Sequence, residues 1–98
     1  MAYGIVLEFD NTVGKKQYDA VNEKLGIDMG AGTGPWPDGL RSHAGGTTPT
    51  GFVVFEVWDS KAQQEAWMSG GLGAALTAVG VPAPTRVTDV EITGFNAP

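Results

Sequence analysis

The chain has 98 residues, with 11 acidic side chains against 6 basic ones, and therefore a formal net charge of −5. Such a chain is poorly suited to neutralising a phosphate backbone or an anionic lipid surface, so we expect no nucleic-acid partner and no membrane partner. The absence of cysteine excludes disulfides, thiolate metal sites and cysteine nucleophiles. The length indicates a single domain over residues 1–98.

The first residues, Met-Ala-Tyr-Gly-Ile-Val, contain neither a basic region nor a long apolar run. This start predicts neither a secretory signal nor a transmembrane segment. We therefore expect a cytoplasmic protein.

The first two elements are a strand and a helix. Residues 3–10 alternate between a strongly apolar face and a mixed face, which predicts a strand. Residues 14–25 carry apolar side chains at helical spacing, with Asn11-Thr12 as the expected cap and Gly26 as the expected end. The expected apolar stripe is Tyr18, Val21 and Leu25, and the expected wet face is Lys15, Lys16, Asp19, Asn22, Glu23 and Lys24.

The middle of the chain predicts a long loop and two strands. Residues 26–39 are rich in glycine and proline, and loops of this length in small domains are usually functional or mobile. Residues 40–46 form a weak strand, residues 47–51 a turn, and residues 52–58 the most strongly β-forming segment of the chain. We expect the two strands to pair as a hairpin.

A second helix and a last strand complete the chain. Asp59-Ser60 followed by Gln63 is typical of a helix start, and Gly70-Gly71 interrupt the apolar pattern before it resumes up to Gly80. Residues 85–95 alternate again as a strand. The resulting order, βαββαβ, predicts a ferredoxin-like α+β fold: a four-stranded antiparallel sheet with two helices on one face.

The face of this sheet that the helices leave open is also expected to be apolar, and therefore to be buried by another surface. We assign the wholly apolar set Val53, Phe55 and Val57 to the helices, which places Phe52, Val54, Glu56 and Trp58 on the open face. An exposed patch of that kind usually marks an interface. We therefore expect a homodimer in which two open sheet faces pack together.

At this point the chain resembles the dimeric α+β barrel proteins, including antibiotic-biosynthesis-monooxygenase-like members and small uncharacterised bacterial ones. The motifs that carry the resemblance are Ser42-His43-Ala44-Gly45-Gly46, the segment Gly51-Phe52-Val53-Val54-Phe55-Glu56-Val57-Trp58-Asp59-Ser60, and Leu72-Gly73-Ala74-Ala75-Leu76 through Gly80-Val81-Pro82. The resemblance implies a sheet-lined dimeric barrel with a pocket between sheet and helices in each protomer. Its members include cofactor-free oxygenases, haem-degrading enzymes, isomerases and proteins without known activity, so the fold does not define the function.

The candidate catalytic group is His43 with Glu56 and Arg41. If the hairpin turns around residues 48–49, Arg41 lies opposite Glu56, with His43 diagonal to it. A carboxylate beside a histidine can orient the ring as a general base, and an arginine can stabilise a developing oxyanion. The same three side chains could instead form a purely structural polar cluster.

Four aromatic residues are candidates for substrate binding. Trp36 lies between two prolines in the long loop, where it could close over a pocket or reach a partner protomer. Trp67 could match a tryptophan that recurs on the second helix of the resembling oxygenases, although core packing explains such a position as well. The other two candidates are Phe52 and Trp58.

No cofactor or metal is predicted. A haem ligand would be expected as a histidine on or just after the second helix, and residues 60–80 contain none. The glycines of residues 30–34 follow a helix instead of a strand, unlike a dinucleotide-binding loop. One histidine without cysteine is a poor basis for a transition-metal site.

Two functions remain open from the sequence. The first is a homodimer that binds a compact aromatic or carbonyl-bearing metabolite, as a cofactor-free monooxygenase or isomerase with His43 as general base. The second is a non-enzymatic structural or binding homodimer, in which His43, Arg41 and Glu56 only stabilise the assembly.

Overall fold

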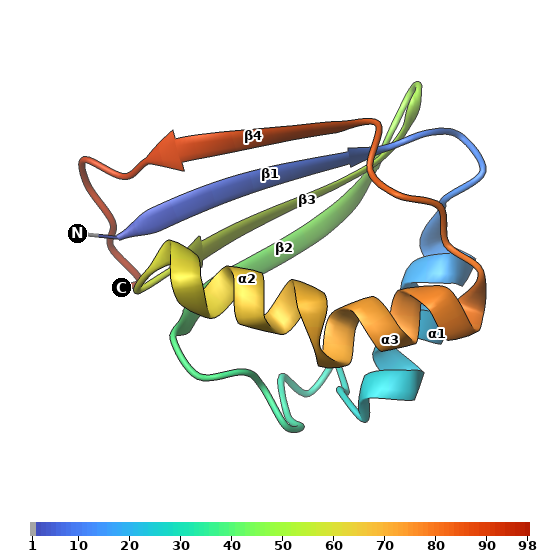
Figure 1. Ribbon diagram of the computed structural model, residues 1–98, viewed down its shortest axis with the longest axis horizontal. Coiled ribbons are helices and arrows are strands. Elements are labelled where there is room, and N and C mark those ends of the chain that lie inside the picture. The colour runs from blue at the N-terminus through green and yellow to red at the C-terminus, as the bar shows by residue number, and fades with distance from the viewer. Residues whose placement is uncertain (1) are drawn as a thin grey trace.

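The computed structural model describes residues 2–98 as a sheet with helices on one face (Figure 1). The strands are β1 (Tyr3–Phe9), β2 (Leu40–Thr48), β3 (Gly51–Trp58) and β4 (Arg86–Glu91), and the helices are α1 (Lys15–Leu25), α2 (Lys61–Ser69) and α3 (Gly71–Val79). The sheet is antiparallel with the order β2-β3-β1-β4. The predicted ferredoxin-like fold is confirmed, with the second helix divided at Gly70. None of the helices in residues 2–98 is long and apolar enough to cross a bilayer.

Helix α1 begins later than predicted. Asp10 and Thr12 hydrogen-bond to each other in the preceding turn instead of capping the helix. Gly14 is the N-cap, and its backbone N–H donates to the Gln17 side chain. At the other end Gly26 adopts the left-handed conformation (φ 74°), as the sequence predicts for a helix terminus.

The helices cover the face of β3 that was expected to be open, so the prediction for the two faces of this strand is wrong. Phe52, Val54 and Trp58 are buried in the main core, with Tyr18, Trp67 and Met68 packed against it. The register explains this orientation, because Phe52 lies opposite Phe9 and Val54 opposite Leu7, on the strongly apolar face of β1. Cross-strand partners share a face, so β3 has to turn its largest side chains the same way.

The open face therefore carries different residues from those predicted. It presents Val53, Phe55 and Val57 of β3, beside Val6 and Glu8 of β1. Phe55 is 39% exposed, whereas Val57 is buried. A homodimer seam built from Phe52, Val54, Glu56 and Trp58 is thus excluded, because the helices already cover these side chains.

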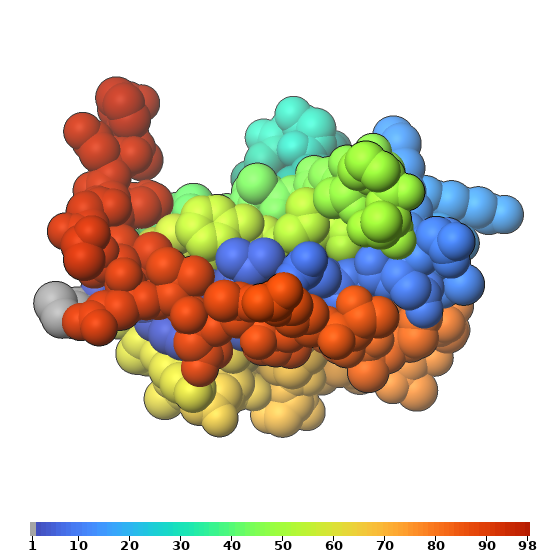
Figure 2. Space-filling model, turned by 90° about the horizontal axis from the view of Figure 1, so that it is seen from above, coloured from blue at the N-terminus to red at the C-terminus, as the bar shows by residue number. Residues whose placement is uncertain are grey.

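The segment after β4 covers one end of the open face. Ile92 lies over Gly4, where an added Cβ would be 2.8 Å from its Cδ1 atom. Farther across the sheet, the Arg41 guanidinium lies 6.0 Å from the centre of the Phe95 ring. Figure 2 shows this C-terminal segment, in red, rising away from the rest of the molecule at one end. The centre of the open face, around Phe55, has no such cover within residues 2–98.

Candidate functional site

A cavity of about 70 Å³ lies between the covered face of the sheet and the helices. Its walls are mostly apolar, and the ionisable or amide side chains that reach it are Gln17, Tyr18, Asn22, His43 and Glu56. A cavity of roughly 150 Å³ accommodates benzene. In the form described here, the space therefore suits a few water molecules or a compact ligand smaller than an aromatic ring.

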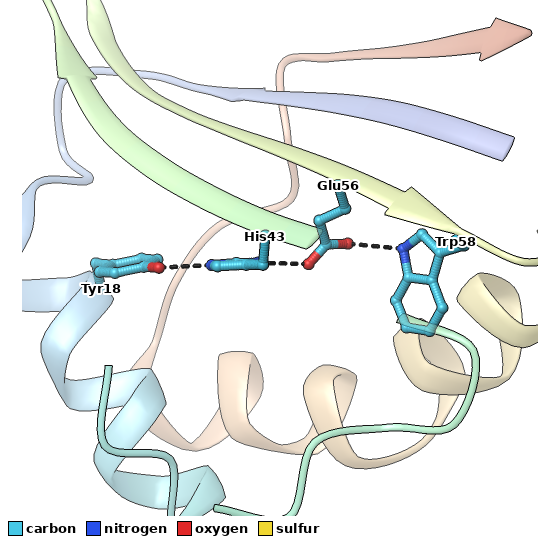
Figure 3. Close-up of polar contacts among 4 residues, drawn as sticks. All are labelled: Tyr18, His43, Glu56 and Trp58. Carbon is cyan, nitrogen blue, oxygen red and sulfur yellow. Dashed lines mark hydrogen bonds and ion pairs between the residues drawn. The ribbon is translucent and has the colours of Figure 1, made fainter. Parts of the chain in front are cut away.

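A chain of hydrogen bonds runs along one side of this cavity (Figure 3). The Tyr18 hydroxyl lies 2.5 Å from His43 Nε2, and His43 Nδ1 lies 2.7 Å from Glu56 Oε2. The indole of Trp58 donates from Nε1 to Glu56 Oε1 at 3.1 Å. Because a carboxylate only accepts hydrogen bonds, Nδ1 carries a proton toward Glu56. Nε2 is then free to accept the hydrogen bond that the Tyr18 hydroxyl donates.

The β2–β3 hairpin and helix α1 bring these groups together. His43 lies directly opposite Glu56 in the hairpin register, so both side chains point from the sheet toward the helices. Gly45, the next residue of β2 on the same face, leaves room for the tyrosine. A Cβ at Gly45 would lie 2.7 Å from Tyr18 Cε1. The missing side chain at this position allows Tyr18 to lie flat beside His43, with nearly parallel rings 5.8 Å apart.

Burial sets the electrostatics of the site. Glu56 is 3% exposed, and its carboxylate accepts hydrogen bonds from His43 Nδ1 and Trp58 Nε1, which hold it in a fixed orientation. Burial raises the pKa of the Tyr18 hydroxyl. The Asn22 amide, which lies near this hydroxyl without forming a hydrogen bond of normal geometry to it, opposes the shift, and the charge of Glu56 adds to it. Tyr18 is therefore protonated near neutral pH and is a hydrogen-bond donor in the resting site.

Asn22 is the polar group of the site that lacks a partner. It follows Tyr18 by one helical turn on α1 and is only 8% exposed. Its Nδ2 atom is buried without a hydrogen-bond acceptor, the one such side-chain atom within residues 2–98. Buried donors in native proteins are almost always paired, because leaving one unpaired costs about 1–3 kcal/mol.

The structure brings His43 and Glu56 together but removes Arg41 from the cluster. The hairpin register is shifted by two residues from the predicted one, and a bulge between Leu40 and Ser42 takes up Arg41. Its Nε atom pairs with Asp59 at 2.5 Å on the surface. The predicted position of Arg41 opposite Glu56 is therefore wrong, and this side chain cannot stabilise a charge in the cavity.

Three of the four predicted aromatic residues line the cavity: Trp36, Phe52 and Trp67. The Trp36 ring lies 6.0 Å from the His43 ring, and its Nε1 donates to Gly32 O within the same loop. Trp58 is completely buried and supports Glu56 instead of lining the cavity.

Tyr18 and Asn22 line the cavity although the sequence pattern does not predict it. The pattern places Tyr18 in an apolar stripe and Asn22 on the wet face, and the placement of Asn22 is wrong because this residue is buried. Asn22 lies four residues after Tyr18 and three before Leu25, so helical spacing alone places it between two residues of the buried stripe. That spacing is the signal from which the position could have been found.

The ionisable groups that line the cavity form one connected set. Within residues 2–98, no three histidine, cysteine, aspartate or glutamate side chains gather as a metal-binding group. The acid–base groups of the cavity are those of Tyr18, His43 and Glu56, an arrangement in which His43 Nε2 can accept a proton while Glu56 stabilises the imidazolium.

Fold and site together define a small ferredoxin-like α+β domain with a histidine–carboxylate pair at an internal cavity. No family model matches the chain, and no curated protein matches it. Solved structures do match over nearly the whole length. A "putative Antibiotic biosynthesis monooxygenase" from Chloroflexus aurantiacus is 18% identical with a TM-score of 0.66, covering 99% of this chain and 98% of that chain.

Two further structures are of unknown function. A protein from Nitrosomonas europaea is 22% identical with a TM-score of 0.64, covering 99% of this chain and 92% of its own. A dimeric ferredoxin-like protein from Thermobifida fusca is 22% identical with a TM-score of 0.51, covering 91% of this chain and 86% of its own. These likenesses confirm the predicted resemblance at the level of the fold.

Proposed function

We propose that the chain is a small-molecule enzyme that removes a proton from a carbon atom of its substrate without a cofactor. One observation carries this proposal: a Tyr18–His43–Glu56 hydrogen-bonded chain ends at an otherwise largely apolar cavity. Aligned acid–base groups beside an enclosed space are the arrangement that general acid–base catalysis requires.

In this proposal, the Tyr18–His43–Glu56 chain is a proton relay. His43 is the base, and it receives the substrate proton through Tyr18. A substrate C–H proton passes to the Tyr18 oxygen while the tyrosine proton passes to His43 Nε2. The electron pair of the broken C–H bond moves onto the substrate as a carbanion or enolate. Since burial raises the pKa of Tyr18, concerted transfer avoids a free tyrosinate, and Glu56 stabilises the imidazolium that forms.

The same base can serve two reaction classes. An electron-rich phenol instead loses its O–H proton to the same base, and the phenolate has carbanion character at a ring carbon. Attack of that carbon on dioxygen gives a hydroperoxide that loses water to form a quinone, which is a monooxygenase reaction. An enolate that is protonated at another carbon gives an isomerisation. The description of the Chloroflexus aurantiacus protein as a monooxygenase favours the first class. The cavity of about 70 Å³ favours a compact substrate, and an aromatic one requires Trp36 and its loop to move.

The competing proposal is a non-enzymatic protein in which the polar chain is structural. The small cavity favours this alternative. Against it, a buried ion pair is seldom more stabilising than well-packed apolar side chains of the same volume. Stability alone therefore gives little reason for this chain of polar groups at a cavity.

Hydrogen–deuterium exchange at carbon tests the proposal directly. A panel of small ketones, 1,3-dicarbonyls and phenols is incubated with the protein in D2O, and loss of C–H signals is followed by NMR. We expect Tyr18→Phe and His43→Ala to reduce the exchange rate by about 10²–10⁴-fold. Arg41→Ala, outside the cavity, serves as the matched control and should retain the rate. Exchange within threefold of the original in both site variants would exclude the relay.

We further propose that the protein is a cytoplasmic homodimer formed through the open sheet face. Phe55 is exposed at the centre of that face, with Val6 and Val53 beside it. The description of one structural neighbour as a dimeric ferredoxin-like protein supports self-association. Native mass spectrometry of the protein purified from its source organism tests this assembly and also reveals any small molecule bound to it.

A further inference from the structure

We infer that the Asn22 amide binds an oxygen atom of the substrate, and that this substrate is a compact, uncharged carbonyl compound. The inference rests on the proposed enzymatic function. The structure provides a buried donor at the cavity without an acceptor: Asn22 Nδ2. A substrate oxygen is the partner that would satisfy it.

The position of Asn22 fits this role. One helical turn separates it from Tyr18, and both side chains line the same cavity. A carbonyl oxygen that accepts a hydrogen bond from Nδ2 places the neighbouring carbon toward the Tyr18 hydroxyl. As that carbon loses its proton to the relay, negative charge develops on the oxygen. The Asn22 donor then stabilises the enolate, which is the function first predicted for Arg41.

The lining of the cavity defines the charge of the ligand. Among the described residues that line it, none is lysine or arginine, while Glu56 is buried at one side. A carboxylate or phosphate ester would enter without a counter-ion and next to an acidic group. An uncharged ketone requires only the amide donor and the apolar walls.

Binding of butanone tests the inference, followed by ¹⁵N–¹H NMR with the tryptophan indole signals as reporters. We expect saturable shifts of the Trp36 and Trp67 signals. Asn22→Leu should weaken butanone binding about tenfold, the effect of losing one hydrogen bond to the ligand. Because Nδ2 has no partner within the protein, this variant should melt at the same temperature as the original or higher. Asn11→Leu, at an exposed asparagine outside the cavity, is the control and should bind as the original does.

Four results would overturn the inference. The first is that the original protein shows no saturable binding of butanone, and the second is that it binds pyruvate more tightly than butanone. The other two concern Asn22→Leu: butanone binding equal to that of the original protein, or a large fall in the melting temperature. Asn22→Asp, which keeps the shape but replaces the donor with an acceptor, should also lose butanone binding.

The test separates this inference from the proposed function. Butanone binding that depends on Asn22, in a protein without proton exchange at carbon, would support the recognition site and contradict the enzyme. Proton exchange that depends on Tyr18, with butanone binding unaffected by Asn22→Leu, would support the enzyme and contradict the recognition site.

Discussion

The two faces of the sheet use apolar surface for different purposes. The covered face combines the largest aromatic side chains of the strands with a polar chain of Tyr18, His43 and Glu56 at a cavity. Among the residues that the structure describes, the open face has no comparable polar chain. It presents Val53 and Phe55 beside small residues such as Ala44, with the C-terminal segment over one end. The two faces therefore correspond to the two proposals: the acid–base groups lie on the face closed by the chain's own helices, and the proposed dimer seam lies on the face left open.

The largest expected effect concerns the buried pair on the covered face. His43→Leu leaves the Glu56 carboxylate buried with only the Trp58 donor, so we expect a loss of about 3–5 kcal/mol in unfolding free energy. The double variant His43→Leu/Glu56→Gln removes the charge and keeps an acceptor for Trp58, and it should recover a large part of this loss. Urea denaturation measures all variants in one double-mutant cycle. Additive losses would show that the two side chains do not act as a pair.

The next largest effect concerns the dimer affinity of the open face. Phe55→Asp places a charge in the proposed dimer seam, and we expect dimer affinity to fall by about 2–4 kcal/mol, as for an interface hot spot. The monomer should keep its fold, because Phe55 lies on the face away from the helices. Sedimentation measures the assembly, and Thr50→Asp, at an exposed residue of the hairpin turn, is the charge-matched control. An unchanged dimer would place the interface elsewhere.

Alanine substitutions at two neighbouring glycines of β2 compare the packing of the two faces directly. Gly45 faces Tyr18 with no room for a side chain, whereas an added Cβ at Gly46 would meet nothing within 4 Å. Gly45→Ala should cost about 1–3 kcal/mol and displace Tyr18, since overpacking distorts a closed core. Gly46→Ala should change stability by less than about 0.5 kcal/mol. Equal melting temperatures for the two variants would contradict this assignment of faces.

The smallest effect is a pH dependence from the two tyrosines. Burial raises the pKa of Tyr3, with the Asp89 hydrogen bond adding to the shift, and burial also raises the pKa of Tyr18. Because the folded state holds these protons more tightly, their contribution to stability is complete below the unfolded pKa near 10 and is lost as pH rises through the folded values. Absorbance at 295 nm should show tyrosinate at higher pH in the native protein than in urea. Coincident titrations would contradict the shifts.

How far the sequence predicts the molecule depends on the range of the interactions. The order of elements, the glycine end of α1 and the pairing of β2 with β3 as a hairpin follow from local pattern, because alternation and helical spacing are properties of neighbouring residues. The candidates His43 and Glu56 also follow, since a register error of two residues keeps both side chains on the same face.

Only the tertiary structure decided which face of β3 the helices cover. Both faces are apolar enough to be buried, so the choice depends on Phe9 and Leu7 of a strand distant in the sequence. The same long-range packing brings Tyr18 and Asn22 of α1 to His43, and a bulge in β2 takes Arg41 away from it. The sequence by itself therefore determined the fold and two members of the site. The remaining members required three-dimensional contacts, because cross-strand register and helix docking place residues that no local pattern connects.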